Sequence, residues 1–256
     1  MIDVLRIPIA KADLMKLTPE ERGLFLLLGY ASNQVNALWK LVIIATNRSP
    51  TDPVDERVSA AQAQIFVRLL VGVMREAWAL VEKRFLQAKL GKEFVSVLDP
   101  QARAALESLK KRFGQSNMIV AVRTHYAFHH PELDDMEEAF QLAAAATSED
   151  ADWSLYMSNT LLNCFFFVSD FVIAHGITRA VGETDILDGH RKLLGDLAPI
   201  ADELSEFTFG FAAAIFRKHF GSELTATIVA KLKDAPQIGD LTLPFYIEAP
   251  AEAPIV

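Results

Sequence analysis

Cysteine is almost missing from this sequence. The single residue, Cys164, excludes a disulfide within the chain. It lies in the apolar run from Leu161 to Val168, where we expect a buried thiol that packs as a small hydrophobic group. That setting does not favour a nucleophile or a metal ligand.

Long apolar runs are missing as well. The longest charge-free stretches, residues 23–39 and 154–169, include several Asn, Gln and Ser residues, and neither reaches the roughly 20 apolar residues that span a bilayer. Residues 1–16 carry five charged side chains and no apolar segment typical of a signal peptide. We therefore expect a cytoplasmic protein that has no membrane partner.

The sequence also lacks the glycine-rich motifs that bind phosphate groups. Neither GxGxxG nor GxxxxGK[ST] occurs, which argues against a dinucleotide or P-loop enzyme, and we expect no cofactor. The net charge of -8 is unevenly distributed, with +6 over residues 1–130 and -14 over residues 131–256. Such a split can mark a nucleic-acid surface on one half, although solvated helix faces also produce it.

Helical signals cover most of the chain. Thr18-Pro19-Glu20-Glu21 combines a capping threonine, proline at the first helical position and a glutamate three places after the threonine. Periodicity and breakers then predict helices over about residues 19–47, 54–86, 100–113, 117–130, 133–146, 154–181 and 185–219. The hydrophobic fraction of 51% is sufficient for a large core.

The predicted fold is an all-α multi-helix bundle that forms a single domain over residues 1–256. Its helical core covers residues 18–220. The N-terminal segment 1–16, with alternating apolar residues from Ile2 to Ile9, and the proline-containing tail 234–256 are expected to be extended. This arrangement allows one small pairing between the two ends of the chain.

Histidines gather in one short segment. Three of the six lie in Val122-Arg-Thr-His-Tyr-Ala-Phe-His-His-Pro131, beside an arginine and a tyrosine and at the end of a predicted helix. His175, His190 and His219 stand alone, and we predict no role for them.

This segment resembles the HEPN superfamily, whose helical-bundle members share an arginine, usually a polar residue after it, and a histidine four to six residues further on. Arg123-x5-His129 fits the spacing, as does Arg123-x6-His130. The run VRTHYAFHHPELDDMEEAF carries the likeness over about twenty residues, and the bundle-like remainder agrees with it. Many members have Asn, Asp or His directly after the arginine, where this chain has Thr124.

The resemblance implies metal-independent cleavage of RNA in a cleft that two subunits share. We therefore expect a homodimer that binds single-stranded RNA, with a neutralising protein partner as a further possibility. Histidine suits proton transfer near neutral pH, and the arginine fork can hold phosphate oxygens. Arg123 is accordingly the expected phosphate ligand and His129 the acid or base, with His130, Tyr126 and Thr124 as helpers.

Three alternatives remain open at the level of sequence. A continuous helix would bring His130, rather than His129, back to the face of Arg123. The segment could instead be structural, capping a helix end in a non-catalytic interaction or scaffold protein. Finally, His125 and His129, four residues apart, could bind a metal in a metal-dependent hydrolase, with Asp134, Asp135 or Glu137 supplying a carboxylate.

Overall fold

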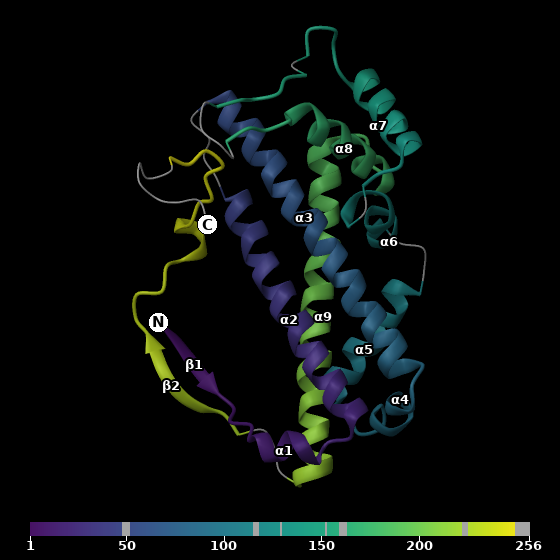
Figure 1. The fold of residues 1–256 in the computed structure, drawn as a ribbon, viewed down its shortest axis with the longest axis vertical. Coiled ribbons are helices and arrows are strands. Elements are labelled where there is room, and N and C mark those ends of the chain that lie inside the picture. The colour runs from purple at the N-terminus through teal and green to yellow at the C-terminus, as the bar shows by residue number, and fades with distance from the viewer. Residues whose placement is uncertain are drawn as a thin grey trace. The chain divides into compact units, whose positions relative to one another are not determined.

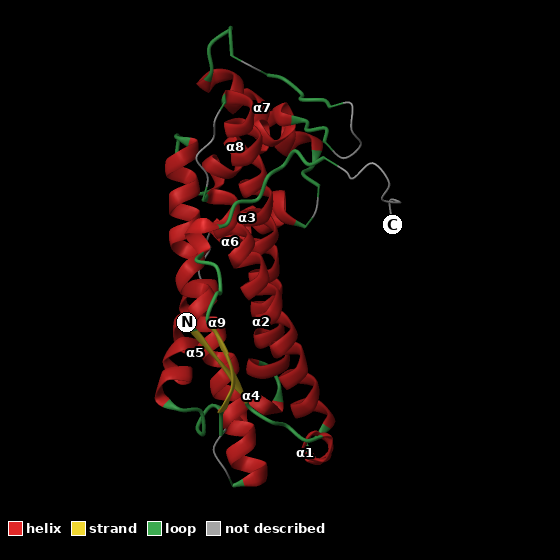
Figure 2. Cartoon of the chain, turned by 90° about the vertical axis from the view of Figure 1, so that its left-hand side faces the viewer, coloured by secondary structure: helices red, strands yellow, loops and turns green. Residues whose placement is uncertain are grey.

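The computed structural model describes residues 1–47, 52–114, 118–128, 130–151, 153–158, 163–221 and 225–248. Across these residues the chain is a mostly helical bundle with one two-stranded sheet, which confirms the expected fold class (Figures 1 and 2). The elements in chain order are β1 (Ile2–Arg6), α1 (Lys11–Lys16), α2 (Pro19–Thr46), α3 (Pro53–Val81), the π-helical turn η1 (Glu82–Leu86), α4 (Lys89–Phe94), α5 (Pro100–Phe113), α6 (Met118–Val122), the π-helical turn η2 (Arg123–Ala127), α7 (Leu133–Ala146), α8 (Phe167–Ala180), α9 (Ile186–Phe220), β2 (Thr227–Leu232) and the 3-10 turn η3 (Ile238–Asp240).

Contacts group the chain into two compact units. Unit 1 consists of residues 1–37, 72–120 and 195–237, and unit 2 consists of residues 38–71, 121–194 and 238–256. The long helices α2, α3 and α9 contribute residues to both units. Among the helices described, none combines the length and the apolar character that crossing a membrane requires. The single domain expected from the sequence stays a prediction.

Unit 1 is built around four phenylalanines with no exposed surface. Phe85 contacts Phe207 and Phe211 edge to face, with ring centroids 5.1 Å and 5.6 Å apart, and Phe94 contacts Phe211 at 5.2 Å. Edge-to-face pairs of this kind add to the free energy gained by burying the rings. The cluster therefore fastens η1 and α4 to α9 within unit 1.

Unit 2 packs α7 against α8 through small and aromatic side chains. Ala139 and Ala143 of α7 are fully buried with Val172 of α8, and Trp153 and Phe171 lie against them. A half-buried ion pair joins α3 to α8, with the Arg68 guanidinium 2.6 Å from the Asp170 carboxylate. The small residues allow α7 and α8 to approach closely.

The N-terminal strand β1 forms a pair near the other end of the chain, but its partner is β2 and not the predicted extended tail 234–256. β1 is antiparallel to β2, which precedes the predicted extended tail, and Val229 forms an irregularity between the Val4 and Leu5 pairings. The segment 1–16 was expected to be extended throughout. That prediction is wrong over Lys11–Lys16, which form the short helix α1.

The helix predicted over residues 154–181 is shorter than expected. It begins only at Phe167, and Tyr156 and Phe165 before it exchange two backbone hydrogen bonds of 2.8 Å and 2.7 Å in an isolated bridge. Phe165 packs edge to face against Phe245 at 5.0 Å, a contact that no local pattern predicts. Cys164 is exposed, so its expected burial is wrong as well.

Substitutions at two glycines of α9, Gly195 and Gly210, can test the packing of unit 1. A Cβ at Gly210 would overlap the Ala102 side chain of α5, whereas one at Gly195 would meet open space. Gly195→Ala should therefore stabilise the protein by up to about 1 kcal/mol through helix propensity. Gly210→Ala should destabilise it, because overpacking costs about 1–3 kcal/mol. Urea unfolding of both variants measures this; equal stabilisation would contradict the described contact of α5 with α9.

Candidate functional site

The histidine-containing segment adopts an unusual backbone conformation. α6 continues directly into the π-helical turn η2, which contains Arg123 through Ala127, and the chain bends at Phe128. Single π-helical turns of this kind occur often at functional sites. The turn contains four of the residues considered for the site, Arg123, Thr124, His125 and Tyr126. It ends before the other two, His129 and His130.

Arg123 and Thr124 occupy different environments at the start of this turn. The Arg123 side chain is half-buried, with its Nε fully enclosed, whereas Thr124 is exposed. A partly enclosed guanidinium is held in place better than a freely solvated one, and its electrostatic interaction with an anion is less screened. These properties suit the phosphate-binding role that the resemblance implies for Arg123.

His125 forms the best-defined polar contact of the segment. Its Nδ1 lies 2.9 Å from Oδ2 of Asp135 at the start of α7, and the two side chains are 46% and 26% exposed. A carboxylate hydrogen-bonded to one imidazole nitrogen orients the ring. The contact with Asp135 uses Nδ1 and leaves Nε2 outside this pair.

Tyr126 has a packing role in the structure. Its hydroxyl and ring lie against Gly176 of α8, so closely that a Cβ at position 176 would come within 2.5 Å of the hydroxyl oxygen. Burial raises the pKa of the Tyr126 phenol, and the negative charges of Asp135 and Glu138 raise it further. Tyr126 is therefore a neutral phenol at physiological pH that fixes η2 against α8.

His129 and His130 follow the end of the helical turn, so the continuous helix considered for them is not present. Because the helical turn ends at Ala127, His130 does not return to the face of Arg123 by helix periodicity, and it is exposed. His129 lies outside the described residues, so the choice between the two stays a prediction. The same holds for the metal site at His125 and His129; within the described ranges, no three His, Cys, Asp or Glu side chains form a group suited to a metal ion.

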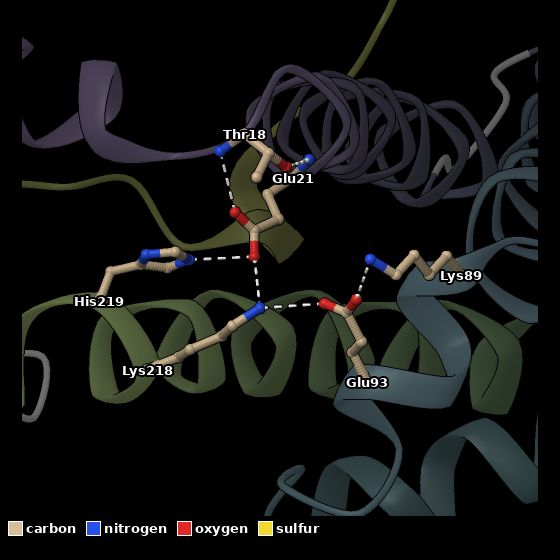
Figure 3. Close-up of polar contacts among 6 residues, drawn as sticks. All are labelled: Thr18, Glu21, Lys89, Glu93, Lys218 and His219. Carbon is tan, nitrogen blue, oxygen red and sulfur yellow. Dashed lines mark hydrogen bonds and ion pairs between the residues drawn. The ribbon is translucent and has the colours of Figure 1, made fainter.

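Sequence reasoning missed a second polar cluster, in unit 1. Thr18 and Glu21 form the predicted capping box, in which the Thr18 N–H donates to Oε2 of Glu21 at 2.9 Å and the Glu21 N–H donates to Oγ1 of Thr18 at 3.2 Å. Figure 3 shows that Oε1 of Glu21 also meets Lys218 and His219 of α9, at 2.8 Å and 3.0 Å. His219, for which no role was predicted, therefore has a structural partner.

This cluster extends from the buried Glu21 to the surface. Lys218 also contacts Glu93 of α4 at 3.1 Å, and Glu93 in turn contacts Lys89 at 3.1 Å (Figure 3). Burial alone would raise the pKa of Glu21, but hydrogen bonds from Lys218, His219 and the Thr18 backbone lower it to about 2. Glu21 therefore stays ionised although only 1% of its side chain is exposed.

Comparison with known proteins provides no relative for this chain. No protein-family model matches it, and no curated protein and no solved structure matches it either.

Replacing Glu21 should change how stability depends on pH. Its folded-state pKa of about 2 lies below the usual 4.5, so its contribution is present above pH 4.5 and is lost as pH falls towards 2. Glu21→Gln should cost roughly 1–3 kcal/mol at pH 7, because two donors lose a charged acceptor. Urea unfolding at pH 7 and pH 3 should show this difference shrinking at the lower pH.

The exposed neighbour Glu20 provides the matched control, because Glu20→Gln removes the same charge one residue away. Equal effects of the two substitutions at both pH values would show that Glu21 has no special role.

Proposed function

We propose that the protein is a metal-independent endoribonuclease or RNA-binding protein of HEPN type, with residues 123–130 as its RNA site. The observation that carries this proposal is the contact of His125 with Asp135, on an accessible turn that also contains Arg123. The contact supplies an oriented imidazole on the same turn as the Arg123 guanidinium, and these are the two kinds of group that cleavage of RNA without a metal needs.

The proposed chemistry is an attack by a ribose 2′-hydroxyl on the adjacent phosphate. One histidine accepts the hydroxyl proton, and the guanidinium of Arg123 offsets charge on the phosphate oxygens. A second histidine donates a proton to the 5′-oxygen that leaves, so the products are a 2′,3′-cyclic phosphate and a 5′-hydroxyl. His129 keeps the acid or base role that the resemblance implies, and His125 is the second proton-transfer group.

Carboxylates near the site limit how RNA can bind. Asp134, Glu137 and Glu138 follow closely on the turn in α7, and negative charge there opposes a long polyanion. The proposed site therefore takes one phosphate at Arg123 and does not track a long backbone. Binding should accordingly show the weak salt dependence of a complex with few phosphate contacts.

A homodimer belongs to the same proposal, because the resemblance implies a site that two subunits share. Apolar side chains that a partner could cover are present on α2 and α9 of unit 1. Leu26, Tyr30 and Phe209 are 53%, 62% and 63% exposed. Exposed apolar groups that lie close together are typical of protein interfaces.

A non-catalytic interaction protein is the second candidate function, and one observation favours it. An apolar groove of about 490 Å³ lies in unit 1, lined by α2, α9 and residues that follow β1. None of the described residues that line it is charged, and Tyr30, Ser32 and Asn33 are among its polar residues. Such a surface suits a protein partner better than RNA, because base-stacking surfaces usually carry interleaved Lys and Arg.

The ribonuclease proposal predicts a graded set of activity losses with single-stranded RNA. His129→Ala should lower the cleavage rate by about 10² to 10⁴-fold, because positioned proton transfer contributes on that scale. Asp135→Asn should cause a smaller loss by releasing the His125 ring, and Arg123→Ala should also weaken RNA binding. His130→Ala is the control and should matter less than His129→Ala.

EDTA should leave the rate unchanged. Loss of activity with EDTA and its recovery with zinc or manganese would instead favour the metal site at His125 and His129. If the wild-type protein neither cleaves nor binds RNA, and Arg123→Ala mainly lowers the melting temperature, the segment is structural and the interaction function should be kept.

The dimer is tested separately by sedimentation. A stable interface should bury on the order of 1,200 to 2,000 Å², enough for a dimer at tens of micromolar protein. Phe209→Asp should shift the population towards monomer if the apolar surface on α9 forms the interface. Wild-type protein that sediments only as a monomer would make a shared active site untenable.

A further inference from the structure

Unit 1 contains a cleft that the RNA proposal does not use. It has a volume of about 390 Å³ and is lined by the start of α2, the turn η1 and the start of α4. This volume lies within the range of about 300–1,000 Å³ that is typical of small-molecule sites. Its apolar lining includes Leu24 and Leu90, both almost fully buried, together with Leu27.

Three cationic side chains surround this apolar lining. Lys83 and Arg84 come from η1, and within the described part of the chain neither makes a hydrogen bond or an ion pair. Among the described residues, Lys89 forms its ion pair with Glu93, and the Lys89 side chain is 88% exposed. Exposed pairs of this kind contribute little to stability, so Lys89 can exchange Glu93 for a bound anion at small cost.

The acidic residues of the cleft do not cancel this positive charge. Glu20 and Glu93 are the two carboxylates in its lining, and Glu93 already accepts hydrogen bonds from Lys218 and Lys89. The cleft therefore combines an apolar floor with net positive charge at its rim.

The walls are held in place by the core of unit 1. Phe85 lies inside η1 and is fully buried against Phe207 and Phe211, so the backbone that carries Lys83 and Arg84 is held at the surface. α4 approaches η1 closely at Gly91, where a Cβ would come within 2.6 Å of the Phe85 carbonyl oxygen. A cleft bounded by such fixed elements is formed before any ligand binds.

We propose that this cleft binds an amphipathic anion, a carboxylate or phosphate monoester with an alkyl chain. The head would lie among Lys83, Arg84 and Lys89, and the chain would cover Leu24, Leu27 and Leu90. Ammonium and guanidinium groups attract either type of anionic head. Removing the alkyl chain and the exposed part of Leu27 from water supplies the apolar binding energy. This inference is independent of RNA cleavage.

A ligand series tests both halves of the proposal by isothermal titration calorimetry on the full chain. Decanoate and decyl phosphate should bind, while decanol, acetate and inorganic phosphate should bind at least tenfold more weakly, since each lacks the charge or the chain. Equal affinity for decanol and decanoate would overturn the role of the cations. Vesicles of anionic phospholipid form a further arm, and binding to them without binding to decanoate would overturn a site for free amphiphiles.

Two glycines of α2 supply a matched pair of variants that should both fold. A Cβ at either Gly23 or Gly29 meets open space, but only Gly23 lines this cleft. Both substitutions to leucine improve helix propensity. Gly23→Leu should fill the cleft and weaken decanoate binding at least tenfold, whereas Gly29→Leu should leave it unchanged. Equal affinities in the two variants would place the ligand elsewhere.

Charge reversal tests the head group in the same way. The double substitution Lys83→Glu and Arg84→Glu should abolish binding of decanoate and decyl phosphate. Lys92 on α4 is exposed and lies outside the cleft. Lys92→Glu should therefore leave the affinity for decanoate and decyl phosphate within twofold of the wild type. Equal losses in the two proteins would mean that overall charge, and not this cleft, governs binding.

Discussion

The buried carboxylate of Glu21 connects distant parts of unit 1, and much of that unit depends on it. Its charge is stabilised by the Thr18 backbone, Lys218 and His219, so the start of α2 and the end of α9 are fastened together. β1 and α1 precede α2, and β2 follows α9. This contact therefore also brings the two strands close enough to pair. An ionised group with so little exposure is tolerated only while these donors remain in place.

Local signals predicted the start of this arrangement but not its partners. The capping box at Thr18 and Glu21 follows from four consecutive residues, whereas Lys218 and His219 lie 197 and 198 residues from Glu21. No periodicity relates positions so far apart. The helix over Pro100–Phe113 was predictable because Asp99 caps its start and Pro100 follows. The helix over Leu133–Ala146 was predictable from its periodicity and from Pro131 before it. The helix predicted around Phe165 is wrong, because a short apolar run fits a helix or an extended segment equally well.

The candidate site shows the same division between chemistry and geometry. Residue types alone singled out residues 123–130, because histidine and arginine together suit phosphate chemistry. Their expected arrangement assumes a regular α-helix, whereas the π-helical turn η2 does not follow that periodicity. The contact of His125 with Asp135 crosses the break at Pro131, so helix spacing could not predict it.

The π-helical turns η1 and η2 have the same local structure and occur at two different candidate sites, the cleft in unit 1 and the histidine-containing segment in unit 2. Each follows an α-helix directly, and each contains one aromatic residue that packs into its own unit: Phe85 against the phenylalanine core, and Tyr126 against Gly176. A π-helical turn disturbs the regular backbone hydrogen bonding, and burial of the aromatic side chain offsets that cost. The anchored ring fixes the backbone of the residues next to it, Lys83 and Arg84 in η1 and His125 in η2. The polar side chains of each turn therefore start from a defined backbone position, which a binding site requires.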